Sequence, residues 1–173
     1  MPLSLLLVFG FSLAPADTPT KGVRAEILFW IADAEKKIVG LAEAMPEDKY
    51  GWRPSEGVRS VSEVFMHVAT GNFGIPRMVG IDPPIKMEQG MEKSVKEKAK
   101  VVEMLKRSFA HLKETVGKIT DADLDKATKM FGMESTYRNV LILLAVHNHE
   151  HLGQSIAYAR SNGVTPPWSM GGE

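Results

Sequence analysis

Four amphipathic stretches constrain this chain more than any other feature. They cover about residues 21–45, 60–72, 92–119 and 135–162, and in each one apolar residues recur three or four positions apart. That spacing places the apolar side chains on one face of an α-helix. The segments between the stretches show no period-two alternation long enough for a β-strand. The sequence therefore predicts an all-α fold with four helices.

Residues at the ends of the stretches predict the helix boundaries. Pro46 ends the first stretch, since proline lacks the amide hydrogen that a helix interior requires. Ser60 and Glu63 have the spacing of a capping box at the start of the second stretch, and Gly163 is a typical terminator of the fourth. The connections are longer than the loops that usually join antiparallel helices. We therefore expect a four-helix bundle in which at least one connection crosses over the end of the bundle.

Charge and cysteine content exclude several classes of protein. The sequence has 21 Lys plus Arg against 21 Asp plus Glu, which argues against a nucleic-acid binder. It contains no cysteine, so disulfide scaffolds, thiolate metal sites and cysteine nucleophiles are excluded. Any metal ion must therefore be held by His, Asp or Glu.

The N-terminal segment has the pattern of a signal peptide. Residues 1–16 contain no charged side chain and combine an apolar run over 3–13 with the small-residue pattern Ala-Pro-Ala. Cleavage before Asp17 is expected, although the usual Lys or Arg near the start is missing. The run is too short for a bilayer span, which takes ~20 residues. We predict an exported protein, periplasmic or extracellular, in which residues 17–173 fold as one domain; the alternative is a cytoplasmic protein whose N-terminal segment packs or frays.

Histidines of the fourth stretch carry the strongest chemical signal. His147 and His151 are four residues apart and share one face of the helix, whereas His149 points away and is expected to be solvated. Two imidazoles one turn apart can bind one metal ion. The pair continues the apolar face that includes Val140 and Leu144, so we expect it to face the interior of the bundle.

His67 on the second stretch is a candidate third ligand. Together the three imidazoles would form a site with an open coordination position. Spacing alone does not establish this long-range contact, so the three residues could also be buried neutral histidines that donate to carbonyls or hydroxyls. His111, away from the apolar face of the third stretch, is expected to be exposed.

The sequence resembles the DinB-like family of metal-binding four-helix bundles, from the first helix to the tail. The resemblance is carried by residues 50–54 (YGWRP), by the helix start over 60–67, and by His147 with residues 151–154 (HLGQ). It is closest to an exported bacterial branch, in which a signal peptide precedes a segment similar to residues 56–61 and a histidine-rich fourth helix.

This resemblance implies a metal site and a homodimeric assembly. In the family, one histidine of the second helix and two histidines spaced by four on the last helix bind a divalent ion, and these positions match His67, His147 and His151. The family's helices follow an up-down-down-up order, and its members are commonly homodimers. Characterised relatives include thiol-dependent S-transferases and isomerases, and some members look like metal-dependent hydrolases.

The chemistry of three neutral imidazole ligands limits the reactions that such a site could catalyse. They leave the ion's double positive charge unneutralised, so a bound water or thiol becomes more acidic. Zinc or nickel is the expected ion, with manganese or iron as alternatives. The predicted function is a metal-dependent enzyme acting on a small molecule, either a hydrolase or a thiol S-transferase; export would favour hydrolysis or a non-catalytic role. The alternative is a non-catalytic dimeric bundle in which the ion is structural.

Glu63 is a weak candidate for a catalytic role beside the metal. It lies one turn before His67 and could accept the second N–H of that imidazole or act as a base, but its alternative role is the helix cap. Glu92 and the lysines that follow it are expected to form a solvated face.

Four further side chains are candidates for the pocket around the metal. Asn72, Gln154 and Tyr158 could line it, or could satisfy neighbouring polar groups. Trp52 could contribute a wall, although packing in the core or at its rim explains it better.

Overall fold

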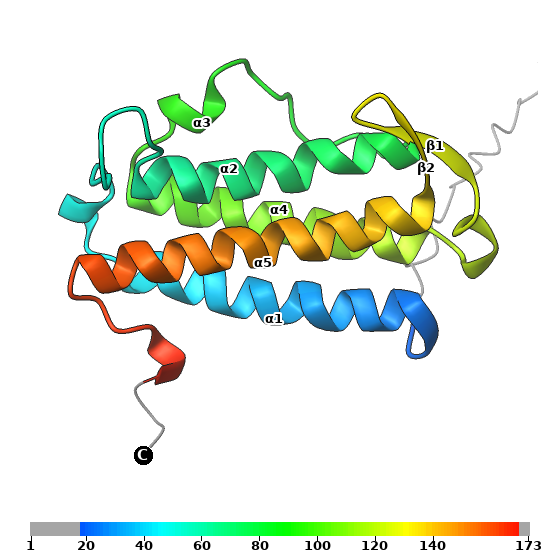
Figure 1. Cartoon of the computed structure of the whole chain (residues 1–173), viewed down its shortest axis with the longest axis horizontal. Helices are drawn as coiled ribbons and strands as arrows, with labels where there is room; N and C mark the ends of the chain where they lie inside the picture. Colours follow the sequence, from blue (N-terminus) through cyan, green and yellow to red (C-terminus); the bar gives the residue numbers. More distant parts are fainter. Residues whose placement is uncertain (1–17, 170–173) are drawn as a thin grey trace, which may run out of the picture.

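Four long helices lie side by side in the computed structural model, which describes residues 18–169 (Figure 1). Within that range the bundle is formed by α1 (Gly22–Ala44), α2 (Val61–Gly74), α4 (Lys98–Lys118) and α5 (Tyr137–Ser161). The predicted all-α bundle is therefore confirmed. The predicted signal peptide over 1–16 lies outside the described residues. None of the described helices is long and apolar enough to cross a membrane.

The helices follow an up-down-down-up order. In Figure 1, α1 and α5 run in one direction, and α2 and α4 run in the other. Because α2 and α4 are parallel, the chain between them must return along the full length of the bundle. That connection carries the one-turn helix α3 (Met91–Ser94) and passes along the outside of α2. The predicted long crossover is present, but it follows the side of the bundle and does not cap its end.

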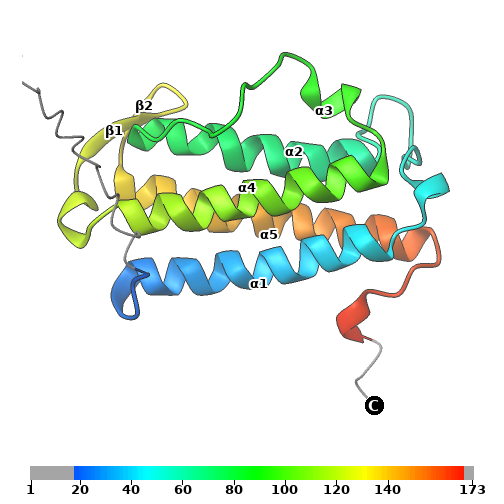
Figure 2. The same ribbon diagram turned by 180° about the vertical axis from the view of Figure 1, so that it is seen from behind.

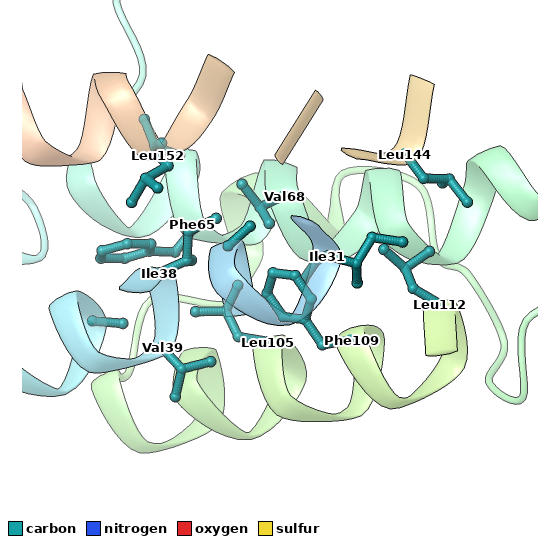
Figure 3. Close-up of a cluster of buried hydrophobic side chains, with 14 of the residues drawn as sticks. Ile31, Ile38, Val39, Phe65, Val68, Leu105, Phe109, Leu112, Leu144 and Leu152 are labelled. Carbon is teal, nitrogen blue, oxygen red and sulfur yellow. The ribbon is translucent and has the colours of Figure 1, made fainter. Parts of the chain in front are cut away.

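Side chains from all four long helices meet in one core. Figure 3 shows Ile31 and Ile38 of α1 facing Leu105 and Phe109 of α4, with Phe65 of α2 beside them. None of these five side chains is more than 2% exposed. Each apolar face predicted from the helical spacing thus packs against the others, and burial of this surface is the main force that holds the helices together. The reverse view in Figure 2 shows α1 and α4 side by side.

The capping box predicted at the start of α2 is present. The Ser60 hydroxyl accepts a hydrogen bond from the Glu63 amide, and the Glu63 carboxylate accepts one from the Ser60 amide. Two amide groups that the first turn of a helix leaves without partners are thereby satisfied. This cap fixes where α2 begins, and therefore the height of His67 in the bundle.

The helix predicted over 92–119 is interrupted. Val95 and Glu97 both have extended backbone angles, and residues 95–97 separate α3 from α4. At the start of α4, the Lys98 ammonium donates to the carbonyls of Glu43 and Met45 at the end of α1, 2.7 Å from each oxygen. The chain leaves the crossover here and joins the bundle. The apolar periodicity of the sequence continues across this point, although the helix is broken.

A short hairpin contradicts the prediction that no segment forms a strand. β1 (Ala127–Met130) and β2 (Met133–Thr136) pair antiparallel, with Met130 opposite Met133. The two turn residues, Phe131 and Gly132, both have positive φ, at 52° and 84°. A two-residue turn of this kind matches the twist of the strands. The strands are only four residues long, too short for a reliable period-two signal.

Candidate metal centre

Three histidines from two helices meet between α2 and α5. His67 comes from α2, and His147 and His151 come from consecutive turns of α5. One ring nitrogen from each lies within 4.8 Å of those of the other two. The structure therefore brings together the pair predicted from helical spacing and the third residue that spacing could not place. A cluster of this size could hold one metal ion.

Hydrogen bonds to the outer nitrogens orient two of the rings. The Nδ1 of His67 lies 2.9 Å from Glu92 Oε2, and the Nδ1 of His151 lies 2.9 Å from Gln154 Oε1. Both oxygens are acceptors, so both Nδ1 atoms carry the proton and both Nε2 atoms keep a free lone pair. This is the arrangement that metal-bound histidines generally show.

His147 supports the same interpretation from the inner side of the cluster. Its Nε2 lies 3.4 Å from the Nε2 of His67, while its Nδ1 is buried without a hydrogen-bond partner among the described residues. With His67 protonated on Nδ1, the close Nε2 atoms either share a proton or direct lone pairs at the same point. A cation between them would satisfy both nitrogens, so the donor set fits a metal ion.

Gly71 creates the space that the ring of His147 occupies. It follows His67 by one turn of α2, and a Cβ atom added at this position would lie 2.5 Å from His147 Cε1. Ordinary carbon contacts are about 3.5–4.0 Å. Any side chain at position 71 would therefore displace the His147 ring or separate α2 from α5. Apolar spacing and histidine spacing did not indicate this residue; a glycine inside a helix was the available signal.

Burial keeps His67 and His147 neutral. It lowers the pKa of His147 to about 4, and the neighbouring His151, His67 and Arg59 lower this pKa further. Burial also lowers the pKa of His67, although the hydrogen bond to Glu92 opposes this shift. Neutral imidazole is the form that binds metal ions, so both side chains are in the ligating form at pH 7.

Glu92 is the carboxylate of this site, and the prediction that it belongs to a solvated face is wrong. One of its oxygens accepts from His67, and the other accepts from Arg59 Nε. Burial tends to raise the pKa of Glu92, but the hydrogen bonds from Arg59 and His67 outweigh it and hold the pKa below its usual value. Glu92 therefore remains ionised beside the histidine. Its position in the connection, 25 residues from His67, gave no local sequence signal.

Glu63 has the role of the helix cap and makes no hydrogen bond to His67 in the described part of the chain. Besides the capping box, its Oε1 lies 3.2 Å from Arg53 Nη2. Burial opposes ionisation of this carboxyl, but the hydrogen bonds from the Ser60 amide and from Arg53 lower its pKa below the usual value. A carboxylate that is already engaged by these donors, with a lowered pKa, is a poor general base.

The candidate pocket residues divide into two groups. Gln154 and Tyr158 belong to the surroundings of the site: the Gln154 amide donates to the Tyr158 hydroxyl, which donates to the Arg59 carbonyl. Trp52 packs edge-on against Tyr158, with ring centroids 5.3 Å apart. Asn72 is instead fully buried beside α4 and α5, where it donates to Ser108 and accepts from Asn148.

The two remaining histidines differ from their predicted exposure. His111 is only 4% exposed and lies beside Phe73, so the expectation that it is solvated is wrong. His149 points away from the cluster as predicted, but it is only partly exposed: its Nδ1 donates to the Ala145 carbonyl and its ring packs edge-on against Trp30. Packing of a neighbouring helix over these faces explains both differences.

Comparisons with known proteins agree with this fold. A sequence model of the DinB superfamily matches residues 31–155, which include all three histidines. A DinB-like protein from Bacillus cereus has a similar structure, with a TM-score of 0.73 at 17% identity over 83% of this chain and 95% of its own. A DinB-like protein from Bacillus subtilis gives a TM-score of 0.63 at 22% identity over 81% of this chain and 94% of its own. No curated protein matches the chain.

Proposed function

The chain belongs to the DinB superfamily, and from this membership and the histidine cluster we propose that the protein binds one divalent metal ion through His67, His147 and His151. The observation that carries the proposal is the convergence of three imidazoles whose ligand nitrogens lie within 4.8 Å of one another. Imidazole is a ligand of intermediate softness that suits zinc, nickel and iron. We propose zinc or nickel as the native ion, with manganese or iron as alternatives.

The second part of the proposal is that the metal centre is catalytic. Three protein ligands are typical of catalytic sites that keep a position open, whereas structural zinc sites have four. The site also approaches the surface, since 26% of the His67 side chain is exposed. When bound, such an ion acidifies a water or thiol and polarises a carbonyl. We therefore propose a small-molecule hydrolase or thiol S-transferase; the alternative is a bundle in which the ion only ties α2 to α5.

Metal analysis of untagged protein tests the binding proposal. We expect one divalent ion per chain in the wild type and its loss in the His67→Ala and His147→Ala variants. His149→Ala is the matched control, because this residue shares α5 but points away from the cluster. A metal-free wild type that also refuses added zinc and nickel would overturn the proposal.

Unfolding experiments separate the catalytic role from the structural one. If the ion is structural, the His151→Ala variant should unfold or lose most of its stability, because binding energy is then folding energy. If the site is catalytic, this variant should lose the metal while keeping its helical circular dichroism signal. Substrate screens would then compare ester or amide hydrolysis with thiol transfer.

We further propose that the protein is a homodimer through an apolar face on α1 and α5. This face exposes 52% of Trp30 and 55% of Val146, with Phe29 and Ile142 beside them on the same two helices. Trp30, Ile142 and Val146 also line a groove between the helices. Contiguous exposed apolar surface of this kind commonly marks an interface.

The charges around the groove are complementary to a second copy. Arg138 and Glu150 both line the groove and lie about 18 Å apart along α5, at a rise of 1.5 Å per residue. A two-fold axis midway between them, close to Ile142 and Val146, sets each Arg138 opposite the Glu150 of the other copy. Such self-complementarity is what a two-fold interface requires.

Light scattering after size exclusion tests the dimer. We expect the wild type to be dimeric and Val146→Glu to be monomeric. Met133→Glu is the control, because Met133 is at least as exposed as Val146, at 63% against 55%, but lies on the hairpin. The Glu150→Arg variant should weaken the dimer, and adding Arg138→Glu should restore it. A monomeric wild type, or a dimer that survives Val146→Glu, would contradict the proposal.

We also propose export, on the pattern of residues 1–16. Mass spectrometry of protein recovered from its native host should give a chain that begins at Asp17. Recovery of the intact N-terminus from the cytoplasm would refute this proposal.

A further inference from the structure

The crossover connection between α2 and α4 brings a side chain to the metal centre. Its one-turn helix α3 carries Glu92, whose side chain is only 24% exposed. The two carboxylate oxygens are divided between two donors, Nδ1 of His67 at 2.9 Å and Nε of Arg59. Such full engagement of a carboxylate on a long connection needs an explanation, because the connection could pass the bundle without touching the site.

We propose that Glu92 is a positioning residue of the metal centre, which fixes the tautomer and the orientation of His67 so that Nε2 is presented to the ion. The inference rests on the proposed metal-binding function and adds a further residue to that site. A carboxylate behind a ligand histidine orients the ring and makes its free nitrogen a stronger donor. Glu92 acts only through His67 and need not touch the ion or a substrate.

The three histidines are oriented in different ways, which explains why His67 depends on a distant residue. His151 finds its acceptor, Gln154, one turn further along the same helix. The ring of His147 is confined by the surface of α2 at Gly71. His67 has no acceptor for Nδ1 on α2 or α5 among its hydrogen bonds in the described chain, and Glu92 supplies it.

A chain of hydrogen bonds links Glu92 to the opposite side of the cluster. From Glu92 it passes to Arg59, whose carbonyl accepts from the Tyr158 hydroxyl, which accepts from Gln154. Gln154 in turn accepts from His151. The outer nitrogens of two ligands on different helices are therefore tied to each other through the protein. This arrangement holds the two rings in register before any ion arrives, which lowers the cost of binding.

Three variants test the role of Glu92. Glu92→Ala removes the acceptor, Glu92→Gln keeps an oxygen acceptor but removes the charge, and Glu88→Ala changes an exposed carboxylate of the same connection. The zinc dissociation constant is measured by competition with a chromophoric chelator. The tautomer of His67 is measured in the metal-free protein by nitrogen-15 NMR of the imidazole ring. Circular dichroism confirms that each variant is folded.

We expect zinc affinity to fall about 10–100-fold in Glu92→Ala, the usual effect of losing such a partner. Glu92→Gln has one amide oxygen for the two donors, His67 and Arg59, so it should also lose affinity, and Glu88→Ala should bind as the wild type does. In metal-free protein, the Nδ1–H tautomer of His67 should be dominant in the wild type and in Glu88→Ala, and lose its dominance in Glu92→Ala. A purely structural role of the connection would lower stability without changing the tautomer.

The outcomes distinguish this inference from the proposed function. If the wild type binds no zinc, the proposed function fails. If the wild type binds zinc and Glu92→Ala binds it equally well with an unchanged His67 tautomer, the metal site stands and the role of Glu92 is refuted.

Discussion

The contact between Gly71 and His147 gives the sharpest prediction about the metal centre. Alanine is normally the better residue inside a helix, by about 1 kcal/mol over glycine. At position 71, however, the new methyl carbon would lie 2.5 Å from His147 Cε1, about 1 Å closer than an ordinary carbon contact. Gly71→Ala therefore has two opposing effects: a more favourable helix propensity, and a steric clash with the ligand His147.

The expected magnitudes follow from these two opposing effects. Overpacking of this size costs about 1–3 kcal/mol, so the net change in the free energy of unfolding should lie between zero and a loss of about 2 kcal/mol. The effect on zinc should be larger, because metal–ligand distances tolerate only about ±0.2 Å, and the His147 ring must move by roughly 1 Å. We expect zinc affinity to fall at least tenfold.

Gly40→Ala is the matched control. Gly40 lies inside α1, and nothing lies within 4 Å of an added Cβ atom. This variant should gain about 1 kcal/mol, which raises the melting temperature by about 2–4 °C for a chain of this size, and it should keep the zinc affinity of the wild type. Thermal unfolding and chelator competition measure both quantities. If Gly71→Ala is stabilised as much as Gly40→Ala and binds zinc normally, the proposed steric constraint is wrong.

Three further predictions concern acid stability and the helix termini. In metal-free protein, the pKa of His147 is about 4 in the folded state and about 6.5 in the unfolded state. The unfolded chain therefore binds the proton more readily. The free energy of unfolding should fall by up to about 3 kcal/mol as the pH falls from 6.5 to 4. Urea unfolding at pH 7 and pH 5 checks this, and equal stability at the two pH values would refute it. Ser60→Ala should cost about 1 kcal/mol through loss of the cap, seen as a lower urea midpoint, whereas an unchanged midpoint would show that the cap contributes nothing. Lys98→Met should lose about 1–3 kcal/mol, because the ammonium's hydrogen bonds to two carbonyls join α4 to α1; Lys100→Met, which removes only an exposed contact to Glu97, is its control.

The helices of this protein were predictable because their signals are local. Apolar spacing, the capping box at Ser60 and the proline after α1 each act within a few residues, so they can be recognised in any sequence. The hairpin was not predicted, since its four-residue strands are stabilised by pairing with each other and leave little periodicity. The break between α3 and α4 was missed for a related reason: apolar side chains continue across it while the backbone changes direction.

The candidate metal centre was likewise only partly predictable from local signals. Helical geometry alone placed His147 and His151 on one face. The position of His67 on the second stretch made it a candidate ligand, and the resemblance to the DinB-like family implied its place in the metal site. Gly71 and Glu92 became visible only in the structure, because each acts on a residue that is distant in sequence. The sequence by itself determined the helices and the pair of histidines on α5. The tertiary structure alone decided what surrounds them, since the side chains that orient a metal ligand are selected by the packing of separate helices and not by their spacing along the chain.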